Sequence, residues 1–178
     1  MATRPIVRPA DLAGLRLRVP DGRMFAETFS ALGAVPVTIN VNGIYDGLKN
    51  GRVDAQENPL AVVELFRLDQ VVKYVSLTNH VWSGFNLLAH KGNWDRLPEG
   101  IRRAIERHAA RAIRRQREDQ RRLNESLRVR LAGRGLVFND VDVRPFRARL
   151  SREYAQWRER IGATAWSLLE ATIGAIGR

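Results

Sequence analysis

The fold is decided by the stretch Gly51-Arg-Val-Asp-Ala-Gln-Glu-Asn-Pro-Leu60, read together with Leu15-Arg-Leu-Arg-Val-Pro20. The first stretch places three polar side chains, Gln56, Glu57 and Asn58, where a short strand should end and a helix begin. Ligands of an open α/β sheet bind at such junctions, outside the carboxyl ends of the strands. A binding site in this chain is therefore expected at this junction.

The second stretch alternates apolar and basic residues, which predicts a strand with Arg16 and Arg18 on one face. A guanidinium offers two parallel N–H donors that match the two oxygens of a carboxylate. Arg18 lies nearer the carboxyl end of the strand, so it is the better candidate for binding an organic anion. The alternative is that Arg18 is a surface residue of an edge strand.

Asn58-Pro59 is typical of a helix start, with asparagine as the N-cap and proline at the first helical position. Asn58 is therefore either a cap alone or a cap that also contacts an anion at the positive end of the helix. Glu57 cannot stabilise an anion directly, so we expect it to orient a neighbouring donor or to lie in a hydrogen-bond network. Asn79 and His80 follow a predicted strand. They are either polar residues of a turn and the core, or residues that contact the ligand.

Short helical and extended patterns alternate over the first 80 residues, which predicts an α/β fold with a doubly wound sheet. Helices are predicted over 24–32, 44–51 and 60–68, and extended segments over 15–19, 35–40, 53–56 and 71–77. The apolar segment Val81 to Lys91 predicts a buried strand. Trp82 and Phe85 of this segment are predicted to be core residues, and so is Val41, which follows the extended segment 35–40.

The second half of the chain is predicted to be mainly helical. Apolar residues at helical spacing predict a long helix from about Glu99 to Leu131. At 1.5 Å per residue its length approaches about 50 Å, so it should bridge more than one body or protrude. A short strand over 136–139 and helices over 141–161 and 164–176 complete the chain.

The net charge of +11 comes mainly from arginine, because only three of the 30 basic residues are lysines. Many arginines lie between Arg102 and Arg160. A solvated helix face is the simplest explanation. The alternative function is a basic, Arg-rich helical protein that binds nucleic acid or an acidic surface.

The sequence does not favour an enzyme, and no metal or cofactor is expected. There is no cysteine, and His80, His90 and His108 are not at zinc-ligand spacings. No nucleophile elbow, P-loop or dinucleotide-binding glycine motif follows a strand. The first residues lack an apolar run long enough for a signal peptide, so the chain as written is expected in the cytoplasm.

Four motifs, in this order, carry a resemblance to a known family. They are Asp11-Leu-Ala-Gly-Leu-Arg-Leu-Arg-Val-Pro20, Ala31-Leu-Gly-Ala34, Ile44-Tyr-Asp-Gly-Leu-Lys-Asn-Gly-Arg-Val-Asp-Ala-Gln-Glu-Asn-Pro-Leu60 and Val72-Lys-Tyr-Val-Ser-Leu-Thr-Asn-His80. The chain resembles the solute-binding proteins of tripartite ATP-independent periplasmic (TRAP) transporters, of the DctP type.

The resemblance implies a periplasmic receptor whose two α/β lobes close on an organic acid, such as a C4-dicarboxylate. The receptor delivers this acid to the membrane permease subunits, and no nucleic acid is expected as a partner. By resemblance, Arg18 and Asn58 bind the carboxylate of the ligand, and Val41, Asn79 and His80 complete the expected binding set. The run Val41-Asn-Gly43 departs from the bulkier family pattern, so we expect a different pocket wall.

By the same resemblance, the chain is expected to be truncated, starting near the crossover into the second lobe. Residues 1–98 then form that periplasmic-binding-protein-like lobe, 99–132 the lobe-spanning helix and 133–178 a C-terminal strand and helices. A missing N-terminal lobe should leave apolar surface exposed, and with it a tendency to form a homo-oligomer or to bind a partner chain. The residues expected on that surface are Leu150, Trp157, Trp166 and Leu169.

Overall fold

The computed structural model describes residues 1–82 and 84–176, and it contains five parallel strands. In one ladder β1 (Arg16–Val19) lies between β2 (Val35–Thr38) and β3 (Ala55–Gln56), and in the other β4 (Tyr74–Leu77) pairs with β5 (Val137–Asp140). Ala2 joins the ladders through antiparallel bridges to Ala55 and Tyr74. All five strands therefore run in one direction, and their carboxyl ends lie along one edge.

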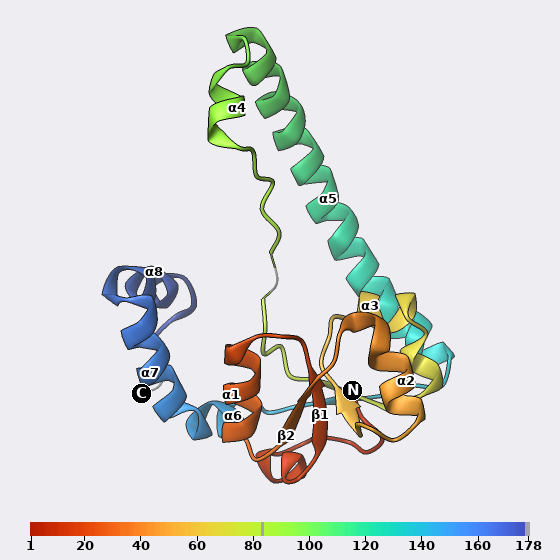
Figure 1. The fold of residues 1–178 in the computed structure, drawn as a ribbon. Helices are drawn as coiled ribbons and strands as arrows, with labels where there is room; N and C mark the ends of the chain where they lie inside the picture. The colour runs from red at the N-terminus through yellow and green to blue at the C-terminus, as the bar shows by residue number, and fades with distance from the viewer. Residues whose placement is uncertain (83, 177–178) are drawn as a thin grey trace.

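Helices cover both faces of this sheet, which confirms the doubly wound α/β prediction (Figure 1). On one face α1 (Arg23–Ala31) packs on β1, with Leu17, Val19 and Phe29 in a shared core. The other core lies beneath α2 (Ile44–Lys49), α3 (Leu60–Leu65) and the end of the long helix. Successive side chains of a strand point to opposite faces of the sheet, so each strand contributes apolar residues to the cores on both faces.

Arg16, on the exposed part of β1, ties β1 to the start of β3 through Asp54. Its Nε and Nη2 donate to the two carboxylate oxygens of Asp54 at 2.9 and 2.6 Å. These hydrogen bonds are the largest influence on Asp54, and they hold the pKa of its carboxyl below the ordinary value. The pair therefore stabilises the fold only while Asp54 is ionised.

We expect Asp54→Asn to lower the free energy of unfolding at pH 7, with the deficit shrinking as the pH falls below about 4. A carboxyl whose pKa is depressed by folding stabilises the native state above its unfolded pKa, and that stabilisation is lost as the pH falls through its folded pKa. Urea unfolding of both proteins across this range measures the difference. Asp46→Asn is the control, because Asp46 forms no ion pair within the described part of the chain. A deficit that stays constant with pH would contradict the assignment.

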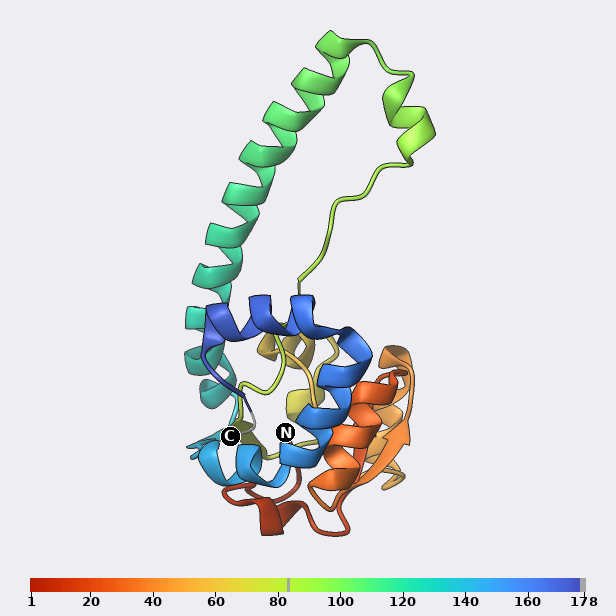
Figure 2. The same cartoon turned by 90° about the vertical axis from the view of Figure 1, so that its left-hand side faces the viewer.

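The prediction of a buried strand over Val81 to Lys91 is wrong. The described residues of this segment contain no strand, and it ends in the short helix α4 (Lys91–Asp95). Trp82 and Phe85, which we predicted in the core, are 90% and 100% exposed. The segment leaves the sheet and runs toward the far end of the long helix (Figures 1 and 2), so no strand lies beside it to bury its side chains.

The long helix, α5 (Glu99–Gly133), confirms the sequence prediction, and it protrudes from the sheet in both views (Figures 1 and 2). Among the described residues, its fully buried side chains are Leu127 and Leu131, and these anchor the helix at its carboxyl end. Ile105 and Ile113, farther along its apolar stripe, are exposed. No helix of the described residues is long and apolar enough to cross a membrane.

Up to residue 176, the C-terminal segment contains three helices, α6 (Arg144–Arg149), α7 (Ser151–Ile161) and α8 (Ala163–Ile173). The prediction of one helix over 141–161 is therefore wrong, because the chain bends at Leu150. The Leu150 side chain is buried in the core beneath α1, and Trp166 is buried as well, so both lie outside the predicted apolar surface. Leu169 is exposed as predicted, and Trp157 is half-buried.

The part of the chain that the structure describes also contains three 3-10 helices. They are η1 (Pro9–Leu12), η2 (Val41–Gly43) and η3 (Leu68–Gln70). The second of them begins within three residues of the end of β2, and it therefore lies at the edge of the sheet where the site was predicted.

Candidate functional site

Arg18 lies near the carboxyl end of β1, in register with Gln56 of β3 and Val37 of β2. It is only 3% exposed, so the alternative of a surface arginine on an edge strand is wrong. Its Nε donates a hydrogen bond of 2.7 Å to the backbone carbonyl of Ile39, just beyond β2. This bond holds one side of the guanidinium and leaves the two terminal nitrogens for other acceptors.

The terminal nitrogens of Arg18 have no hydrogen-bond acceptor among the described residues. Burial lowers the pKa of the guanidinium, and the charge of the nearby Glu57 carboxylate opposes that shift. A buried cation is costly unless it is paired and hydrogen-bonded. An anion that supplied two oxygens to the free side of the fork would meet this requirement.

Asn58 is positioned by Gln56. The Asn58 Nδ2 donates a hydrogen bond of 2.7 Å to the Gln56 Oε1, and Gln56 is almost completely buried. The prediction that Asn58 caps the following helix is wrong, because Pro59 is extended and α3 begins one residue later, at Leu60. The amide of Asn58 is therefore not used as a cap, and its second N–H remains available for an acceptor.

His80 approaches the same edge from the residues after β4. Its Nε2 lies 3.4 Å from Oε2 of Glu57, and its Nδ1 lies 2.7 Å from the Thr78 hydroxyl oxygen. Its ring packs nearly perpendicular to the Phe29 ring of α1, with 5.3 Å between the ring centres. The expectation that Glu57 lies in a polar network therefore agrees with its contact with His80.

The two other predicted site residues lie at neighbouring strand ends. Val41 opens η2 after β2, and its half-buried side chain packs against the second core. Asn79 is exposed, and its backbone is left-handed, with φ of 45°. Neither side chain bonds to Arg18, Asn58 or His80 in the part of the chain that the structure describes.

Two residues of the site were not predicted from the sequence. Thr78 fixes one nitrogen of His80, and Phe29 packs against its ring. The spacing of two residues between Thr78 and His80 was the available local signal. Phe29 gave no such signal, because its place on the apolar face of α1 looks like that of any core residue.

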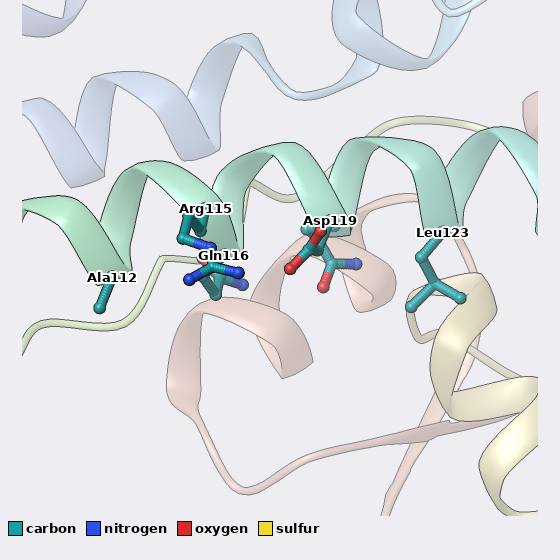
Figure 3. Close-up of a pocket in the computed structure, with 6 residues that line it drawn as sticks. Ala112, Arg115, Gln116, Asp119 and Leu123 are labelled. Carbon is teal, nitrogen blue, oxygen red and sulfur yellow. The ribbon is translucent and has the colours of Figure 1, made fainter.

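A shallow hollow on α5 does not coincide with this site. Figure 3 shows that its lining comes from one helix. The six residues are Ala112, Arg115, Gln116, Asp119, Gln120 and Leu123. One helix cannot surround a ligand on several sides, as small-molecule sites usually do. The described residues also contain no cluster of side chains that could hold a metal ion.

The comparisons with known proteins agree on one family. The family model described as bacterial extracellular solute-binding protein, family 7, matches residues 1–160. A solute-binding protein of Roseobacter denitrificans is 38% identical over 148 residues, which is 82% of this chain and 45% of the relative. The C4-dicarboxylate-binding periplasmic protein DctP of Rhodobacter capsulatus is 31% identical over 109 residues, which is 61% of this chain and 33% of that protein.

Solved structures give the same answer. A TRAP periplasmic solute-binding protein from Roseobacter denitrificans with bound L-galactonate superposes with a TM-score of 0.76 at 34% identity, over 85% of this chain and 50% of that one. The periplasmic ectoine-binding protein of Halomonas elongata superposes with a TM-score of 0.84 at 25% identity, over 95% of this chain and 57% of that one. The chain therefore spans about half the length of the relatives that it matches.

Proposed function

Because the chain belongs to family 7 of the bacterial extracellular solute-binding proteins, we propose that it binds a small organic acid through the acid's carboxylate, as the solute-binding part of a TRAP transporter. The observation that carries this proposal is the buried Arg18 guanidinium, which lies at the carboxyl edge of the sheet with its terminal nitrogens free of partners among the described residues. Asn58 is the second donor to the same carboxylate, and Val41, Asn79 and His80 are proposed to line the site.

The proposed partners follow from the relatives. They include proteins described as binding C4-dicarboxylate, L-galactonate and ectoine, so a C4-dicarboxylate is one candidate among several organic acids. We propose that the protein delivers its ligand to the membrane permease subunits of a TRAP transporter, and that it does so in the periplasm. The part of the relatives that this chain does not span is proposed to supply the opposite wall of the cleft.

Titration of the isotope-labelled chain with L-galactonate and with succinate, followed by NMR, tests the proposed function. We expect amide shifts that saturate at about millimolar ligand, because one wall of a cleft leaves much of the ligand in water. The shifting residues should lie at the carboxyl edge, around Arg18, Ile39 and Asn58. Saturable shifts that were confined to α5 instead would contradict the proposed site.

Binding of nucleic acid by the Arg-rich helix is not favoured by the comparisons. Several arginines of α5 pair with acids of the same helix, which is typical of a solvated helix face. The pairs are Arg103 with Glu99, Arg121 with Glu125 and Arg122 with Glu118.

We also propose that the exposed apolar side chains of residues 81–88 and α5 are covered by a second body. Trp82, Phe85 and Leu88 project from the former segment, and Ile105 and Ile113 from the latter. Apolar surface of this extent on a soluble protein is typical of an interaction site. A second copy of the chain is one possible cover, and the remaining half of a receptor is the other.

We expect the isolated chain to self-associate, because no described residue of the chain covers this surface. Light scattering coupled to size-exclusion chromatography should give a mass above 20.2 kDa that rises with protein concentration. The double variant Trp82→Ser and Phe85→Ser should shift the mass toward that of the monomer. Leu65→Ser, which alters an exposed leucine of α3, is the control. A monomeric mass at every concentration would count against self-association.

A further inference from the structure

We infer that Gly43 is a positioning residue for Arg18, because a glycine at this place lets the turn after β2 close on Ile39, whose carbonyl orients the guanidinium. The inference rests on the proposed function, since it concerns how Arg18 is directed toward a carboxylate. It gives a role to a residue that carries no binding group of its own.

Ile39 connects this turn to the binding arginine. Its carbonyl accepts the hydrogen bond of 2.7 Å from the Arg18 Nε, and its N–H donates to the carbonyl of Val19 at 3.3 Å. The guanidinium is planar and rigid, so the bond at Nε also sets the direction in which the two terminal nitrogens point. Any displacement of the Ile39 backbone is therefore passed on to those nitrogens.

The side chain of Ile39 packs closely against two glycines. A methyl group added to Gly43 would lie 3.0 Å from the Cγ2 of Ile39, and one added to Gly47 would lie 3.2 Å from its Cδ1. Both distances are shorter than the optimal separation of two carbon atoms, which is about 3.5–4.0 Å. Ile39 is only 8% exposed and belongs to the core beneath α2, so its side chain has little space into which it could withdraw.

The two contacts differ in how easily they can be relieved. Cδ1 is the end of the Ile39 side chain, and rotation about χ2 can move it away from Gly47. Cγ2 is bonded directly to Cβ, and the two branches at Cβ restrict rotation about χ1. A methyl group at Gly43 would therefore displace the Cβ of Ile39 and the backbone to which that atom is attached.

The turn itself is fixed against Ile39. The Gly43 N–H donates to the carbonyl of Asn40 at 2.9 Å, and the Asn42 N–H donates to the Asn40 Oδ1 at 3.2 Å. Helix α2 follows directly, and its first residue, Ile44, is 0% exposed in the same core. Because these bonds and this packing hold Gly43 in place, the strain of an added methyl group falls on Ile39.

The Nε–H resonance of Arg18 tests the inference without a ligand. In NMR spectra of the isotope-labelled chain near neutral pH, this buried and hydrogen-bonded group should give a resolved signal, which Arg18→Met assigns by removing it. We expect Gly43→Ala to move this signal or to broaden it by exchange with water, because the hydrogen bond to Ile39 loses its alignment. Gly47→Ala should move the signal less, since Cδ1 can yield.

The affinity for L-galactonate is the second measurement. We expect Gly43→Ala to lower this affinity by about fivefold or more, because charge-assisted hydrogen bonds from the terminal nitrogens depend on their direction. Gly100→Ala is the matched control. It adds the same methyl group to α5, where no side chain of the described residues beyond its two chain neighbours lies within 4 Å of it. This control should leave both the affinity and the Arg18 signal unchanged.

Two double variants show whether the contact with Cγ2 is the cause. Leucine branches one carbon farther from the backbone than isoleucine, so Ile39→Leu removes the branch at Cγ2 and keeps the number of carbon atoms. Ile39→Val keeps Cγ2 and removes Cδ1 instead. Relative to each Ile39 single variant, we expect Ile39→Leu to restore most of the affinity and the Arg18 signal in Gly43→Ala, whereas Ile39→Val should restore neither. A general loss of folding would not distinguish the two.

The outcomes separate this inference from the proposed function. If Gly43→Ala leaves both the Arg18 signal and the affinity unchanged, the inference is overturned and the proposed function stands. The same degree of recovery by Ile39→Leu and Ile39→Val would also overturn it, and this comparison decides the question even where Gly43→Ala alone does not fold. If L-galactonate does not bind to the natural chain, the proposed function fails, and the Arg18 signal still decides whether Gly43 orients the guanidinium.

Discussion

Replacing Arg18 with methionine is expected to abolish the binding of organic acids by this chain, while leaving the fold intact. Methionine fills much of the same volume but cannot donate to a carboxylate. The loss should be at least about tenfold to a hundredfold in affinity, the usual worth of a charge-assisted pair of hydrogen bonds. The NMR titration with L-galactonate measures it directly.

The Arg18→Met substitution should weaken ligand binding without lowering the stability of the fold. The Arg18 guanidinium is buried with its terminal nitrogens unpartnered in the described structure, and its burial is costly without an anion. We therefore expect Arg18→Met to unfold at the same urea concentration as the natural chain, or at a higher one. A residue that served only the fold would show the reverse, with stability lost.

Two variants serve as controls for Arg18. Arg18→Lys keeps the charge but loses the two-pronged geometry, so it should bind more weakly than the natural chain and more tightly than the methionine variant. Arg16→Ala removes the exposed arginine two positions earlier on the same strand, and it should leave binding unchanged. Equal losses in Arg16→Ala and Arg18→Met would refute a specific role for Arg18.

Replacing Leu131 with alanine is expected to destabilise the chain by about 2–5 kcal/mol, the cost of removing a large apolar side chain from a packed core. Leu131 is 0% exposed and lies in the core beneath α3 and β4. Together with Leu127 it anchors the whole of α5, so the loss should also release the helix from the sheet. Urea unfolding followed by circular dichroism measures the change.

Ile105→Ala is the matched control on the same helix. Ile105 is 40% exposed and contacts neither core, so its truncation should change the free energy of unfolding by less than about 0.5 kcal/mol. The measurement should be made at a protein concentration low enough for the monomer. Similar losses for the two variants would mean that the protruding part of α5 is packed in solution.

The predictions that the structure confirms and those that it contradicts differ in kind. Arg18 lies at the predicted strand end and Asn58 at the predicted junction, because a strand's period and a strand-to-helix junction are local patterns. The cap assigned to Asn58 failed over one residue, because the backbone of Pro59 decides where α3 begins. Trp82 and Phe85 were placed in a core because an apolar run resembles a buried strand whether or not a neighbour exists to bury it.

The sequence by itself determined the alternation of strands and helices over the first 80 residues, the two-faced sheet, the length of α5 and the strand end at which Arg18 lies, because each depends on periodicity within a short segment. Only the tertiary structure decided that Arg18 is buried, that His80 faces Glu57, and that Trp82 and Phe85 are exposed. These facts depend on which distant segments meet. The side-chain pattern of one segment predicts which of its faces is apolar, but it does not predict which distant segment packs against that face.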